Sequence, residues 1–159
     1  MTRKSDPMWY RVFGRGSEEP APALLAAHLH GIGLAVEPHF KGDDLGWTSG
    51  ELGLPGLNTP VRADRYLAAE DEIRDDLNSY AALLETCDYS PNSGPLMERV
   101  IQTQQLIVLR RPLDAMDEVK LEELLLATCR HLAASTDGIY QIDGQGWFSA
   151  AGDMLLQEY

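Results

Sequence analysis

Two stretches of the chain place their apolar residues along one side of a helix. The first runs from about residue 69 to 87, and the second follows Asp117, which stands where its side chain can cap a helix N-terminus. An apolar stripe with a period of about 3.6 residues predicts an amphipathic helix with one buried face. The stripes comprise Ile73, Leu77, Tyr80, Ala81 and Leu84 in the first helix, and Leu121, Leu124, Leu125, Thr128 and Leu132 in the second.

Two shorter helices are also predicted. One begins at the prolines of "EEPAP" and ends at the glycines of "GIG", and the other covers "LMERVIQT" (96–103), directly before an apolar strand. Proline suits the first turn of a helix and glycine its end, so these start and stop residues agree with the helical spacing of the apolar residues. The stripe of the first short helix comprises Leu25, His28, Leu29 and Ile32.

Runs of β-branched and aromatic residues predict the strands. The run at 8–14 is apolar on both faces except at Arg11, which indicates a strand near the middle of a sheet. The run at 34–40 alternates, but Pro38 cannot donate a ladder hydrogen bond, so this strand lies at an edge or carries a bulge. Further strands are predicted at 47–54, 61–67 and 105–109.

The last residues, 136–159, contain the turn signals "DGQG" and "AAGD" between strand-like segments. A glycine loop that holds phosphate precedes a helix N-terminus, whereas "DGQG" precedes the strand-like "WFS". We therefore interpret Gly144 and Gly146 as hairpin residues that permit positive φ, with the Asp143 side chain closing the turn.

The resulting order is βαβββα followed by αβαβββ. Helices and strands are mixed without strict alternation, which favours an α+β fold over a doubly wound parallel sheet. We expect a single α+β domain over residues 1–159, with residues 1–7 as a flexible leader. Its sheet is predicted to be mixed, mainly antiparallel, and covered on one face by two to three helices.

The formal net charge of −12 lies mostly in the second part of the chain. Residues 1–60 hold 5 Lys/Arg and 7 Asp/Glu, and residues 61–159 hold 8 and 18. Such a surface repels nucleic acid and anionic membranes and attracts basic partners. Acidity that serves solubility alone is the other interpretation.

Cysteine content and hydropathy indicate the compartment. Cys87 and Cys129 lie in predicted helices and are too few for a disulfide framework, which favours a reducing, cytoplasmic environment. The start of the chain has no signal-peptide pattern, and the longest apolar run is far too short to span a bilayer.

Histidine is a common metal ligand, and the chain has four histidines. His28 and His30 lie two positions apart on a predicted helix, so they point about 200° apart and cannot share an ion. His28 belongs to the apolar stripe and is expected to be partly buried, whereas His30 and His39 could meet if the strand packs beside the helix end. His131 is expected at the surface near a helix C-terminus. We expect no bound metal and no cofactor.

No catalytic motif is present. The sequence contains no nucleophile elbow, no P-loop, no dinucleotide fingerprint and no C-x-x-C pair. The acidic pairs lie in turns or on a solvated helix face, where general acid–base work is not expected. The alternative from another class is a small enzyme or ligand-binding protein with a pocket near His30, His39 and Trp47.

One acidic cluster stands out on the helix predicted from 69 to 87. Its first turn would hold Glu70, Asp71 and Glu72, where the helix dipole favours them. Asp75 and Asp76 would follow one turn later as like-charge neighbours, each pair costing about 0.2–0.5 kcal/mol. A tolerated cost hints at use, and the predicted partner-binding residues are Glu70, Asp71, Asp75 and Asp76.

The segment "LLLATCRHLAASTDGIYQIDGQGWFSAAGDMLL" resembles the C-terminal helix and hairpin of small acidic bacterial proteins, some of which look like immunity proteins of polymorphic toxin systems. The resemblance covers about a fifth of the chain and transfers no site residue. It implies a cytoplasmic protein that binds another protein and carries out no chemistry. The sequence therefore predicts a non-catalytic acidic module that binds a basic protein partner, as an immunity or inhibitor-like protein does.

Overall fold

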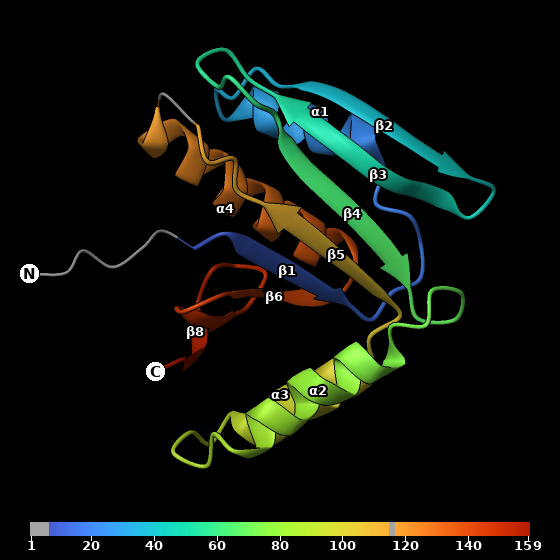
Figure 1. The fold of residues 1–159 in the computed structure, drawn as a ribbon, viewed down its shortest axis with the longest axis vertical. Helices are drawn as coiled ribbons and strands as arrows, with labels where there is room; N and C mark the ends of the chain where they lie inside the picture. Colours follow the sequence, from blue (N-terminus) through green and yellow to red (C-terminus); the bar gives the residue numbers. More distant parts are fainter. Residues whose placement is uncertain (1–6, 115–116) are drawn as a thin grey trace, which may run out of the picture.

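The computed structural model describes residues 7–114 and 117–159, and Figure 1 shows one sheet with helices against it. The elements follow the predicted order. The strands are β1 (Trp9–Gly14), β2 (Glu37–Asp43), β3 (Gly46–Gly53), β4 (Val61–Leu67), β5 (Gln105–Arg110), β6 (Gly138–Ile142), β7 (Gly146–Phe148) and β8 (Met154–Gln157). The helices are α1 (Pro22–Gly31), α2 (Arg74–Glu85), α3 (Ser93–Ile101) and α4 (Glu118–Ser135).

The eight strands form one sheet in the order β2-β3-β4-β5-β1-β6-β7-β8, and each neighbouring pair is antiparallel. The apolar strand β1 lies inside the sheet as predicted, and Val12 is opposite Ile107 of β5 and Tyr140 of β6. Strand β2 lies at an edge, as Pro38 predicts, and its register shifts farther along, between Lys41 and Gly42. The predicted α+β class with a mainly antiparallel sheet is confirmed.

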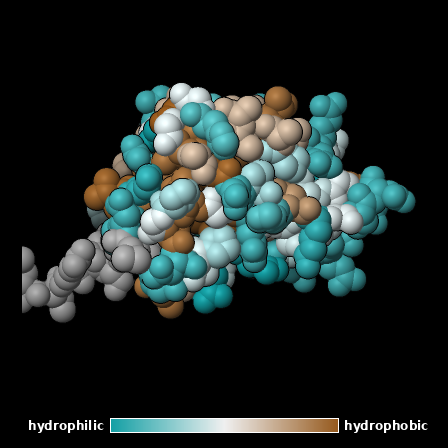
Figure 2. Space-filling model, turned by 90° about the horizontal axis from the view of Figure 1, so that it is seen from above, coloured by the Kyte–Doolittle hydropathy of each residue, from teal (hydrophilic) through white to brown (hydrophobic). Residues whose placement is uncertain are grey.

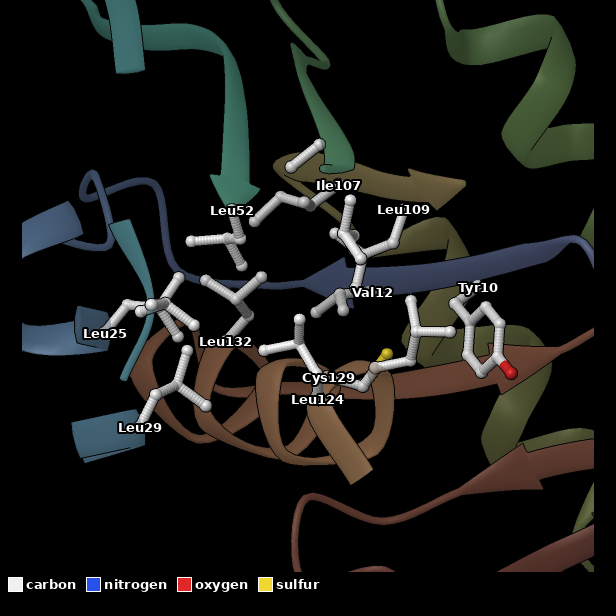
Figure 3. Packing of buried hydrophobic residues seen from close by; sticks show 14 of the residues in the cluster. Tyr10, Val12, Leu25, Leu29, Leu52, Ile107, Leu109, Leu124, Cys129 and Leu132 are labelled. Atoms are coloured by element: carbon white, nitrogen blue, oxygen red, sulfur yellow. The ribbon is translucent and has the colours of Figure 1, made fainter. Parts of the chain in front are cut away.

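Helices α1 and α4 cover one face of the sheet. Leu124, Cys129 and Leu132 of α4 point toward the strands, beside Leu25 and Leu29 of α1 (Figure 3). All five side chains are buried, because the helical stripes face the inward residues of the strands. This layer forms the larger core and spans the sheet from β3 to β6.

Helices α2 and α3 lie against the opposite face. Their buried residues join Phe13 of β1, Leu106 of β5 and Trp147 of β7 in a second apolar cluster. In Figure 1 this helix pair lies at the end of the molecule away from the β2–β3 hairpin, so it leaves the outer face of β2, β3 and β4 open. The expectation that the helices share one face holds only for α1 and α4. Helices α2 and α3 lie on the other face, so the four helices are divided between the two faces of the sheet.

The two edge strands are protected differently. At β2 the hairpin toward β3 carries exposed Lys41 and Asp43, and Figure 2 shows hydrophilic side chains over the end where this hairpin projects. At β8 the carbonyl of Gln157 accepts from the Tyr89 hydroxyl at 2.7 Å, and the carbonyl of Leu155 accepts from Asn92 Nδ2 at 2.6 Å. Charge at one edge and side-chain capping at the other discourage pairing with another strand.

The "DGQG" segment forms the predicted hairpin turn between β6 and β7. Gly146 has φ of 149°, and a Cβ there would lie 2.1 Å from the Leu156 carbonyl oxygen, so the position requires glycine. The predicted role of Asp143 is wrong. Its carboxylate accepts from Arg11 and from Gln141 Nε2 instead of closing the turn, because an arginine on β1 lies within reach.

The start of the chain is only partly described. The predicted leader, residues 1–7, lies outside the described residues except for Pro7, whose carbonyl accepts from Arg111 Nε at 2.9 Å. Among the described residues, no helix combines the length and apolar character needed to cross a membrane.

Candidate functional site

The acidic cluster does not lie on one helix as predicted. Helix α2 begins at Arg74, so Glu70, Asp71 and Glu72 precede it in a turn. The Asp71 carboxylate accepts from the Leu67 backbone N–H at 2.7 Å, and Glu72 has φ of 41°. Side-chain bonding of this kind competes with helix formation, and a left-handed residue interrupts a helix. The prediction that these acids form its first turn is therefore wrong.

Asp75 and Asp76 occupy the first turn instead. The helix dipole stabilises each of them there by about 0.3–1 kcal/mol at an exposed position. The expected like-charge repulsion with Asp71 and Glu72 one turn earlier does not arise in a shared helix. The inference that a tolerated energetic cost indicates use is thus withdrawn, and the case for a site depends on the surrounding surface.

That surface contains a groove of about 640 Å³ between α2 and the outward side of β1, β4 and β5. We call it the α2 groove. Its acidic residues are Asp71, Glu72 and Asp76, and its aromatic residues are Trp9, Tyr66 and Tyr80. Two of the predicted residues, Asp71 and Asp76, therefore lie in it, whereas Glu70 and Asp75 are exposed and do not line it.

The carboxylates of the α2 groove carry uncompensated charge. In the described part of the chain, no lysine or arginine forms an ion pair with Asp71, Glu72 or Asp76. The one arginine that lines the groove, Arg11, pairs with Asp143 at 2.5 Å. The groove thus presents a net negative charge.

The pKa values of the two tyrosines in the groove are raised, mainly by burial. Burial raises the pKa of Tyr66, and nearby Asp64 raises it further. Asp71 and Asp76 act in the same direction on that pKa. Burial is also the main reason why the pKa of Tyr80 is raised. Both rings therefore stay neutral at physiological pH, and the Arg11 guanidinium lies over the Tyr80 ring.

Sequence reasoning missed the aromatic part of the groove. Trp9 and Tyr66 are 36% and 38% exposed. Each lies next to β5, where Trp9 is opposite Arg110 and Tyr66 is opposite Leu106. The alternation of β4 did contain a signal, because Tyr66 shares its face with polar residues.

The residues of the alternative pocket do not converge. Trp47 is buried, and its indole Nε1 donates to the Pro20 carbonyl at 2.8 Å. Phe40 packs edge-on against Trp47, so the preceding residue, His39, points to the opposite side of the sheet. His30 Nε2 lies 2.9 Å from the Val36 carbonyl oxygen, which occupies that nitrogen. The pocket that His39 lines contains neither His30 nor Trp47.

The other histidines lie between helices. His28 is exposed, which contradicts its predicted partial burial, and its ring stacks on His131 of α4 with centroids 5.0 Å apart. His131 is partly covered by this contact between α1 and α4, rather than at the open surface. Burial lowers the pKa of His131, and His28 lowers it further. Within the described residues no group of three His, Cys, Asp or Glu side chains is placed to hold a metal ion.

Buried polar residues elsewhere serve the fold. Arg65 is 4% exposed, and its guanidinium donates to Gln105 Oε1 at 2.7 Å and to the Trp47 carbonyl at 3.1 Å. Both cysteines are free, as expected, and burial raises the pKa of the Cys129 thiol well above its ordinary value. Such an inert thiol is a packing residue.

Comparison with protein-family models, with curated proteins and with solved structures found no match. A function for the α2 groove therefore has to be inferred from its own residues and geometry.

Proposed function

We propose that the protein is a non-catalytic binding module whose α2 groove receives a cationic segment of a basic protein partner. The observation that carries this proposal is the combination in one groove of exposed aromatic rings with three carboxylates that form no ion pair within the described residues. Carboxylates attract a lysine or arginine side chain, and the exposed ring of Tyr66 can hold the same cation by about 0.5–1 kcal/mol. The rings of Trp9 and Tyr80 already lie against Arg110 and Arg11, so they add contact area rather than a free cation site.

The composition of the groove fits a protein interface. Interface centres are enriched in tyrosine and tryptophan, and charged rims guide the encounter. Trp9, Tyr66 and Leu83, which is 61% exposed, supply the apolar contact area. The net charge of −12 adds a long-range attraction for a basic partner and disfavours nucleic acid and anionic membranes.

Recognition is favoured over chemistry because of where the carboxylates lie. A catalytic carboxylic acid that works near neutral pH is held in apolar surroundings. Asp71, Glu72 and Asp76 are all exposed. An immunity or inhibitor-like role in the cytoplasm, as the sequence resemblance implies, is the form of this proposal that we adopt.

The test begins with affinity capture by the parent chain in a lysate of the source organism, followed by mass spectrometry. The association rate of the captured partner is then measured against salt concentration. The test variant is Glu72→Gln/Asp76→Asn, which removes two groove charges while leaving the Asp71–Leu67 hydrogen bond intact. Removal of steering charges is expected to slow association roughly tenfold at low salt and to flatten the salt dependence.

The matched control is Glu98→Gln/Glu123→Gln, which removes two exposed charges on α3 and α4 outside the groove. The control is expected to bind nearly as the parent does. Thermal unfolding of all three proteins shows whether the variants remain folded. Equal rates and equal salt slopes for the parent and the groove variant would overturn the proposal.

A further inference from the structure

A second cavity lies between α3, the C-terminal end of α4 and strands β6 to β8. Its volume is about 480 Å³, within the range of small-molecule sites, and it shares no residue with the α2 groove. Small residues on facing elements, Ala134 on α4 and Ala150 after β7, leave the space open. Leu96, Ile139 and Leu155 form apolar walls. We call this cavity the Arg99 pocket.

Arg99 is the cation that lines the pocket, and it is poorly compensated. Its Nε atom is buried and has no hydrogen-bond partner among the described residues. A terminal nitrogen of its guanidinium donates to the Asp137 carbonyl at a long 3.5 Å. A buried unsatisfied donor costs about 1–3 kcal/mol, and more when it is charged. This arrangement is what an anion-binding residue requires before the anion arrives.

The nearest carboxylate does not neutralise Arg99. Asp137 binds Arg15 instead, through Nε at 3.1 Å and through a terminal nitrogen at 2.9 Å. Arg15 thus binds the carboxylate of Asp137, whereas Arg99 reaches only its backbone carbonyl. Burial lowers the pKa of Arg99 and the charge of Arg15 lowers it further, with Asp137 opposing both. Asp137 lines the pocket beside Arg99, and Arg15 pairs with its carboxylate from outside the lining, so the three groups together carry one positive charge at one end of the apolar walls.

We propose that the Arg99 pocket binds a small monocarboxylate with an apolar body. The carboxylate accepts hydrogen bonds from the Arg99 guanidinium, which offers a planar fork that matches its two oxygens. The apolar body lies against Leu96, Ile139 and Leu155. A single excess cation in apolar surroundings fits a monoanion better than a phosphate, which carries more charge and needs more donors. The inference does not depend on the function proposed for the α2 groove.

The probes are octanoate, 1-octanol and octylamine, which share one apolar chain and differ only in the head group. Binding to the full chain is measured by calorimetry, and the site is located from amide shift changes in NMR spectra. Octanoate is expected to bind with one-to-one saturation and to perturb residues 96, 139 and 155. Octanol is expected to bind more weakly and octylamine not at all.

Two variants and a control separate the site from general adsorption. Arg99→Met keeps a long side chain but removes the cation, and it is expected to weaken octanoate binding about tenfold to a hundredfold. Ala134→Phe fills the cavity from an exposed helix position and is expected to abolish binding without unfolding α4. Arg62→Met removes an exposed arginine on β4 and is expected to change nothing. Absence of saturable octanoate binding to the parent, or equal binding by all variants, would overturn the proposal.

Discussion

The two faces of the sheet are built for different purposes. On one face, α1 and α4 cover β1 and β3 to β6 with a continuous apolar layer. On the other, α2 and α3 cover only the part of the sheet around β1 and β5 to β8. The incomplete layer ends beside exposed rings and forms the α2 groove at its border. One face therefore supplies most of the core, and the other leaves open the surface on which the proposed binding site lies.

Chain connectivity explains why the second layer is incomplete. Helices α2 and α3 follow each other without an intervening strand, between the adjacent strands β4 and β5. They pack on each other and contact the sheet only around β1 and β5 to β8. Helix α4 has 18 residues and a side-chain cap, whereas α2 has 12 and none. The better-stabilised helix lies on the fully covered face.

The largest expected effect comes from removing the strands that both layers use. Tyr140 and Ile142 of β6 face the α1–α4 core, and Ile139, Trp147 and Leu156 face the α2–α3 core. Deletion of residues 138–159 is therefore expected to abolish cooperative unfolding. Thermal unfolding followed by circular dichroism tests this. A truncated chain that melts sharply near the parent temperature would show that the two layers do not depend on β6 to β8.

A matched pair of core truncations compares the faces directly. Leu124 of α4 and Leu77 of α2 are both fully buried. Each Leu→Ala change is expected to lower the free energy of unfolding by about 2–5 kcal/mol, with Leu124→Ala at the upper end because its surroundings are larger and relax less. Urea unfolding measures both. Leu24→Ala on α1, at a residue 65% exposed, is the control and should change little. A larger loss for Leu77→Ala would reverse the comparison.

The sequence predicted the covered face better than the open one. Periodicity is local, so the order of the elements, the central β1 and the edge position of Pro38 could be read from neighbouring residues. The place where the α2–α3 layer ends on the sheet could not be predicted in this way. Trp9 and Tyr66 line the same groove only because β5 lies between their strands, and no local sequence pattern specifies the strand order.

The acidic segment shows a second limit. A run of acids before an apolar stripe is typical of a helix first turn, which is what the sequence predicts here. The same run also suits a turn, because an aspartate can bind a backbone N–H four residues earlier, as Asp71 does with Leu67. Both local patterns satisfy the backbone. In the structure, α2 begins at Arg74, later than predicted, and Ile73 and Leu77 pack into the core between α2, α3 and the sheet.

The cap of α4 provides a smaller test. The Asp117 carboxylate accepts from the Lys120 backbone N–H at 3.0 Å, as predicted from the sequence. Asp117→Ala is expected to lower the free energy of unfolding by about 1 kcal/mol. Asp117→Asn keeps the acceptor and should lose only a few tenths of a kcal/mol, the difference between two good capping residues. Equal losses in urea unfolding would mean that the charge of Asp117, rather than its hydrogen bond, stabilises the helix.

The smallest effect concerns pH at the contact between α1 and α4. Burial and the neighbouring His28 lower the pKa of His131 in the folded state, so the unfolded chain binds a proton there more readily. Above the unfolded pKa of about 6.5, His131 is neutral in both states and does not change the free energy of unfolding with pH. As pH falls through that value toward the lower folded pKa, protonation favours the unfolded chain and the fold loses stability. His131→Gln removes this step. The free energy of unfolding, measured from pH 8 to pH 5, should therefore fall less steeply in His131→Gln than in the parent. His39→Gln, at an exposed histidine on the open face, should follow the parent curve. If His131→Gln follows the parent curve too, the stacked pair does not set the pH response of the covered face.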